Sequence, residues 1–104
     1  MHKNLAVNVL TWNDWENTII CLESIYQSNY DNFDIILIDN NSDKSHLEKI
    51  YDWSKNKIRG EDEEFKFKPH KKINIIEVDI NFKISTPGEK NIYLIKNKTN
   101  VGLT

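Results

Sequence analysis

The sequence is poor in the residues that cross-link a chain or let it turn sharply. Of its 104 residues, one is cysteine, two are proline and three are glycine. Cys21 has no partner for a disulfide within the chain, which favours a reducing compartment such as the cytoplasm. It lies beside the apolar stripe of a predicted helix, so we expect a buried small hydrophobe rather than a nucleophile. Three widely spaced glycines exclude a P-loop and a G-x-G-x-x-G dinucleotide loop: Gly60, Gly88 and Gly102.

Long apolar runs and an excess of one charge are also missing. No segment approaches the roughly 18 apolar residues of a membrane-spanning helix, and residues 1–4 lead into a strand-like segment without a signal peptide. Fourteen Lys and Arg against sixteen Asp and Glu give a net charge of -2, which argues against a nucleic-acid surface. The histidines are scattered and, with one cysteine, predict no metal site: His2, His46 and His70. We therefore expect one small cytoplasmic domain.

Strand, helix and strand alternate over the first part of the chain. Residues 5–10 and 34–39 are short, aliphatic and rich in β-branched side chains, as is typical of buried strands in a parallel sheet. Asn13 and Glu16 have the spacing of a capping box, so Asn13 is the expected N-cap of a helix over residues 14–28. Helical spacing brings one set of side chains to a single face of it: Trp15, Thr18, Ile19, Leu22, Ile25 and Tyr26.

The second half of the chain is less regular. A second helix is expected over residues 44–55, and a third core strand over residues 91–96. The buried face of that helix is predicted to hold Leu47, Ile50, Tyr51 and Ser54. Residues 57–90 fit no core element and are interpreted as an insertion, in which residues 73–80 alternate well enough to form a strand or a hairpin. The prediction is an α/β fold in three layers, with a mainly parallel sheet flanked by helices.

Polar turns follow all three predicted core strands. They comprise residues 11–13, 39–42 and 97–102, and their Asn, Asp, Ser and Thr side chains could hydrogen-bond a base and a ribose. Ligands of open parallel sheets bind at the carboxyl ends of the strands, where Asp39 could accept hydrogen bonds from ribose hydroxyls or a base N–H. Each turn taken singly is equally well explained as an ordinary turn or helix cap. Three turns at one edge of the sheet favour a ligand.

Four short motifs occur in an order that resembles the family 2 inverting glycosyltransferases, most closely their rhamnosyltransferase-like branch. They are residues 7–13 (VNVLTWN), 21–25 (CLESI), 36–42 (ILIDNNS) and 100–103 (NVGL). The match covers residues 5–56 and 91–104 and leaves the insertion unmatched. The resemblance implies a GT-A fold, which is a Rossmann-like sheet that holds a nucleotide-diphosphate sugar.

The resemblance also implies a nucleotide pocket formed by seven residues: Thr11, Trp12, Asn13, Asp39, Asn41, Asn100 and Gly102. Thr11 and Asn13 would line the pocket, and Asp39 would recognise the base or the ribose while Asn41 supports its loop. Trp12 would either stack on the base or simply pack. Asn100 and Gly102 would bring the backbone close to the nucleotide or begin the next helix.

For the intact protein, the resemblance implies transfer of a sugar from a UDP- or dTDP-sugar to a glycan or lipid-linked acceptor at the cytoplasmic membrane face, with Mg²⁺ or Mn²⁺. The family's Asp-x-Asp metal motif and its general base lie downstream of the fourth motif, and the sequence stops at Thr104 before both. We therefore expect an N-terminal part of the enzyme that binds nucleotide weakly, holds no metal and does not catalyse transfer.

Two alternatives stay open beside the enzyme. A non-catalytic interaction module would associate with itself or another protein through an exposed sheet edge or apolar face. A receiver- or flavodoxin-like domain would need an acidic cluster after the first strand, which residues 11–13 do not supply.

Overall fold

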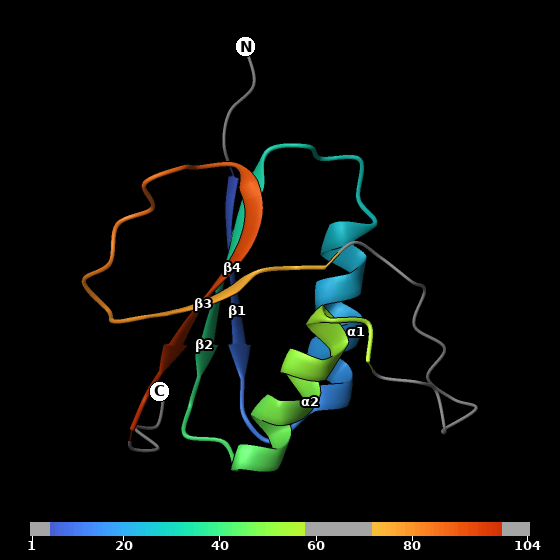
Figure 1. Cartoon of the computed structure of the whole chain (residues 1–104), viewed down its shortest axis with the longest axis vertical. Coiled ribbons are helices and arrows are strands. Elements are labelled where there is room, and N and C mark those ends of the chain that lie inside the picture. Colours follow the sequence, from blue (N-terminus) through green and yellow to red (C-terminus); the bar gives the residue numbers. More distant parts are fainter. Residues whose placement is uncertain (1–4, 58–71, 99–104) are drawn as a thin grey trace.

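The computed structural model describes residues 5–57 and 72–98 of the chain. The elements in chain order are β1 (Leu5–Thr11), α1 (Trp15–Tyr26), β2 (Phe33–Asp39), α2 (Lys44–Ser54), β3 (Ile75–Val78) and β4 (Glu89–Lys96) (Figure 1). The three predicted core strands and the two predicted helices are therefore confirmed, with ends close to those expected from the apolar patterns.

The four strands form one sheet in the order β1-β2-β4-β3, and every pair is parallel. β3 lies within the predicted insertion and pairs with β4, with Ile75 opposite Ile92. The insertion therefore contributes a parallel edge strand. Of the strand and the hairpin considered for residues 73–80, the strand is the one found. A parallel pair needs a crossover between its strands, and residues 79–88 provide it without a helix.

Both helices cover the same face of the sheet, and residues 79–88 run along the opposite side (Figure 1). The reason is the handedness of the connections: β1 to β2 and β2 to β3 step in the same direction across the sheet, so right-handed crossovers place α1 and α2 together. The described residues thus form an α/β sheet with one helical layer, a Rossmann-like half, and the expected third layer of helices is not seen among them. Neither α1 nor α2 has the length and apolarity needed to cross a bilayer.

The core lies between the helices and the sheet. It combines residues from five elements: Val9, Ile19, Leu22, Phe33, Ile35, Leu37, Ile50, Trp53, Ile92 and Leu94. The predicted stripe of α1 is confirmed, with Thr18 also buried. α2 buries His46 and Trp53 besides the expected Ile50 and Ser54. The Trp53 indole N–H donates to Glu23 Oε1 at 2.9 Å, which satisfies the one polar atom of a large buried ring.

Two local predictions are wrong. Cys21 is exposed, because the position before the buried Leu22 is turned about 100° away from the sheet on a helix of 3.6 residues per turn. Asn13 does not cap α1. The N-cap is Asp14, whose carboxylate accepts from the Asn17 backbone N–H at 3.4 Å. Asn13 instead has a left-handed backbone with φ 46°, a conformation that asparagine tolerates better than most residues.

Candidate functional site

The parallel register brings the carboxyl ends of three strands to one edge of the sheet. Thr11 is opposite Asp39, and Asp39 is opposite Lys96. Two backbone hydrogen bonds extend the alignment beyond the strands: Asn40 N–H donates to the Thr11 carbonyl at 2.9 Å, and Asn97 N–H donates to the Asp39 carbonyl at 2.8 Å. The predicted meeting of the polar turns is confirmed as far as Lys98, whereas Asn100 and Gly102 lie outside the described residues.

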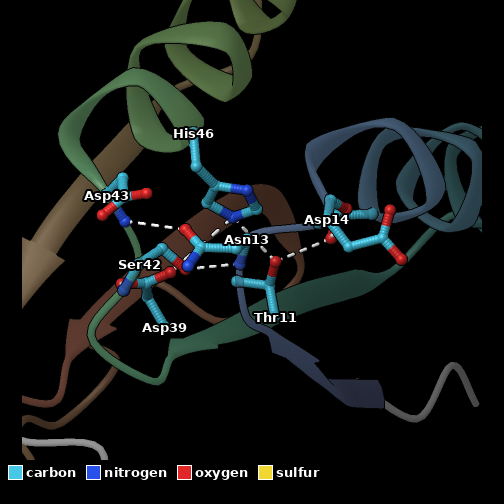
Figure 2. Close-up of polar contacts among 8 residues, drawn as sticks. Thr11, Asn13, Asp14, Asp39, Ser42, Asp43 and His46 are labelled. Atoms are coloured by element: carbon cyan, nitrogen blue, oxygen red, sulfur yellow. Dashed lines mark hydrogen bonds and ion pairs between the residues drawn. The ribbon is translucent and has the colours of Figure 1, made fainter.

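Two of these turns, which we term the edge loops, comprise residues 12–14 and 40–43. Asn13 joins them with two hydrogen bonds (Figure 2). Its backbone N–H donates to Ser42 Oγ at 2.9 Å, and its side-chain Oδ1 accepts from the Asp43 backbone N–H at 2.8 Å. Asn41, in the second loop, also has a left-handed backbone, with φ 60°. The asparagines of both loops therefore serve the backbone geometry of the edge, whatever further contacts they make.

Beneath the edge loops lies a cluster of four buried polar side chains from four elements: Thr11, Thr18, Asp39 and His46. Thr11 Oγ1 is 2.6 Å from Thr18 Oγ1 and 2.9 Å from His46 Nε2. His46 Nε2 also lies 3.7 Å from Asp39 Oδ1. The other oxygen, Asp39 Oδ2, accepts from the Ser42 backbone N–H at 3.0 Å. Figure 2 shows the imidazole reaching from α2 to the ends of β1 and β2.

The hydrogen-bond chain determines where the protons lie. The Thr18 hydroxyl donates to the Asp14 carbonyl at 2.8 Å, because a carbonyl can only accept. The single hydroxyl proton of Thr18 is then used, so the Thr11 hydroxyl must donate to Thr18. Thr11 is left to accept from His46, whose Nε2 therefore carries the proton while Nδ1 is a bare acceptor.

Two buried acceptors of this cluster have no hydrogen-bond partner among the described residues, namely Asp39 Oδ1 and His46 Nδ1. Burial lowers the pKa of His46 below its usual value near 6.5, and the negative charges of Asp39, Asp14 and Asp43 oppose that shift. The imidazole is thus neutral at pH 7. Leaving a buried polar atom unpaired costs about 1–3 kcal/mol, so the cluster keeps acceptor capacity at the expense of stability.

The predicted site residues divide into a buried and an exposed group. Thr11 and Asp39 are buried, the latter with 1% of its surface exposed. Trp12, Asn13 and Asn41 are exposed, and 56% of the Trp12 surface faces solvent. The exposed part of the Trp12 indole is available for stacking.

Sequence reasoning missed His46. It was grouped with two other scattered histidines, and no local motif marks it. A signal was nevertheless present, because His46 stands four residues before the core residue Ile50 and so falls on the same face of α2. Helical spacing could have predicted its burial, but not its contact with Thr11, which lies 35 residues earlier in the chain.

A hollow of about 590 Å³ opens at the carboxyl ends of β3 and β4, on the same edge of the sheet. Its lining is mixed in charge: Glu77, Val78, Asp79, Lys96 and Lys98. Lys96 Nζ lies 3.5 Å from Glu77 Oε1. Within residues 5–57 and 72–98, no three His, Cys, Asp or Glu side chains gather closely enough to hold a metal ion.

Comparison with known proteins does not extend this description. A scan against protein-family models, a search of curated proteins and a search of solved structures each found no match to the chain.

Proposed function

We propose that this chain is the nucleotide-binding part of an inverting glycosyltransferase and that the carboxyl edge of its sheet binds the nucleoside diphosphate of a UDP- or dTDP-sugar. The observation that carries the proposal is the convergence of the edge loops. The turns after β1 and β2 meet at one edge and are joined through Asn13, in the place where open parallel sheets hold ligands. The four sequence motifs of the glycosyltransferase family support the same function.

Several groups at the edge could each supply one part of nucleotide recognition. The Trp12 indole provides an aromatic face for the base, and base–aromatic stacking contributes about 1–3 kcal/mol per base. The amides of Asn13 and Asn41 can donate to and accept from a base or ribose. Lys96 and Lys98, beside the hollow, supply positive charge for the diphosphate.

Sugar transfer itself belongs to the wider proposal, in which the intact enzyme uses Mg²⁺ or Mn²⁺ and a glycan or lipid-linked acceptor. The described residues do not fit such a metal, because they provide no cluster of three ligating side chains. No step of the chemistry is therefore assigned to them. Their proposed contribution is to bind and orient the donor nucleotide.

Titration with UDP and dTDP, followed by tryptophan fluorescence and by NMR, tests the proposal. Wild-type protein should show saturable binding of at least one nucleotide. Trp12→Ala should weaken it about tenfold, because the stacking platform is lost. Tyr30→Ala is the matched control, since it removes an exposed aromatic ring near the amino end of β2. Absence of saturable binding up to millimolar nucleotide would contradict the proposal, and equal affinities of wild type and Trp12→Ala would remove Trp12 from the site.

The alternative of self-association stays a prediction. The surface it would use is the outer edge of β1, which is an edge strand of the described sheet and exposes Leu10 by 60% and Leu5 by 45%.

A further inference from the structure

His46 contacts the supports of both edge loops although no sequence motif includes it. We infer that His46 is a positioning residue whose imidazole holds the two edge loops in place for the nucleotide. The inference rests on the proposed function for its ligand, but its structural part can be tested without one.

Two contacts of one imidazole nitrogen carry the inference. Nε2–H donates to Thr11, and the chain of hydrogen bonds continues through Thr18 to the carbonyl of Asp14, which ends the first edge loop. The same Nε2 lies 3.7 Å from Asp39 Oδ1, and the second oxygen of Asp39 accepts from Ser42 in the second edge loop. One ring therefore connects the two loops from below, while Asn13 connects them at the surface (Figure 2).

Burial separates these supports from any ligand. His46 exposes 3% of its surface and Asp39 exposes 1%, so a nucleotide at the edge cannot reach either group unless the cluster opens. Among the predicted site residues, those that face solvent are Trp12, Asn13 and Asn41. The buried pair can therefore influence a ligand only by setting the position of these residues.

Protonation of His46 should disturb this arrangement. The new proton would go to Nδ1, which has no hydrogen-bond acceptor among the described residues. The charges of three carboxylates act on the ring from different parts of the fold: Asp39 at the end of β2, Asp14 before α1 and Asp43 before α2. Their charges favour the imidazolium, but desolvation dominates and lowers the pKa of His46. The edge loops should thus be held at pH 7 and change on acidification below the usual histidine pKa near 6.5.

Variants of His46 separate the hydrogen bond from the titration. His46→Leu removes the donor and should weaken UDP binding about tenfold, the affinity equivalent of one lost hydrogen bond. His46→Gln places an amide N–H near the position of Nε2–H, so it should recover most of that loss. Because His46→Gln does not titrate between pH 7.5 and 5, the affinity of wild type relative to His46→Gln should fall over this range. Glu48→Gln, an exposed change on the same helix, is the control.

A ligand-free measurement completes the test. In an NMR titration of wild type, the backbone amides of Asn13, Ser42 and Asp43 should shift with the pKa of His46, and these shifts should vanish in His46→Gln. Equal UDP affinities of His46→Leu and wild type, or an equal loss of affinity on acidification in His46→Gln, would overturn the inference. If neither UDP nor dTDP binds wild type, the proposed function fails and the amide shifts test the positioning role by themselves. Shifts that follow the titration of His46 support that role, and shifts independent of it overturn the role.

Discussion

Strand β2 carries a buried aspartate near each end, and the two carboxylates are satisfied in different ways. Asp34 accepts two backbone N–H groups, from Gly88 at 2.6 Å and from Asn91 at 3.4 Å. Asp39 accepts one, from Ser42, and its remaining oxygen faces a neutral histidine at 3.7 Å. Both are almost fully buried, so burial does not explain the difference.

The comparison shows that Asp34 anchors one strand to another, whereas Asp39 belongs to the candidate site. Asp34 uses both oxygens to fasten the start of β4, which lies more than fifty residues along the chain from it. Asp39 retains an oxygen without a hydrogen bond, and the imidazole beside it also has one unpaired nitrogen, Nδ1, whereas stability alone would favour partners for both. Such incomplete satisfaction is expected where polar groups serve a function, and it distinguishes the carboxyl edge from the amino edge.

The largest effect that tests this comparison should come from Asp34→Asn. The amide has one oxygen instead of two and loses the negative charge, so two charge-assisted hydrogen bonds are weakened or broken. We expect the free energy of unfolding to fall by about 3 kcal/mol. Urea denaturation measures it, with the exposed Asp31→Asn as control. Equal losses in the two variants would show that Asp34 is not an anchor.

A smaller loss is expected from Asp39→Asn, about 1 kcal/mol in the same urea experiment. The remaining carbonyl oxygen can still accept from Ser42, and the oxygen that is replaced makes no hydrogen bond in the wild type. If Asp39→Asn destabilises the protein as much as Asp34→Asn, then Asp39 is an anchor too and the contrast between the two edges disappears.

The smallest effect concerns pH. The pKa of His46 is lowered in the folded protein, so on acidification the unfolded chain takes up this proton first. The contribution of His46 to stability is therefore fully present above about pH 6.5 and is lost as the pH falls below it. The loss should stay below about 1.4 kcal/mol per pH unit, the limit for one proton.

Unfolding free energies of wild type and His46→Gln at pH 7.5 and 5.5 measure this contribution, and the wild type should lose more stability on acidification. The difference between the two pH values should persist in Asp34→Asn, because Asp34 lies at the other end of β2. A wild type that gains stability relative to His46→Gln on acidification would mean that the carboxylates, not desolvation, control the ring.

The edge could be predicted from sequence better than the cluster beneath it. Aliphatic runs marked the ends of β1 and β2, and parallel strands bring such ends together. Hence Thr11 and Asp39 were correctly placed side by side. Their burial was not predicted, because a polar residue at the end of a strand is expected at the surface unless a helix is known to cover it. The sequence left Trp12 open between stacking and packing, since a large aromatic side chain usually packs, and only the tertiary structure showed how much of it is exposed.

Local patterns in the sequence determined the order of strands and helices, the parallel sheet and the apolar faces of α1 and α2, because each depends on the spacing of side chains within a short segment. Only the tertiary structure decided that His46 meets Thr11 and Asp39, that Asp14 replaces Asn13 as the cap of α1, and that β3 pairs beside β4. The contact of His46 with Thr11, and those that hold Asn13 to the second edge loop and away from the cap, join segments far apart in the chain. The packing of helices on the sheet selects them from many partners of similar chemistry.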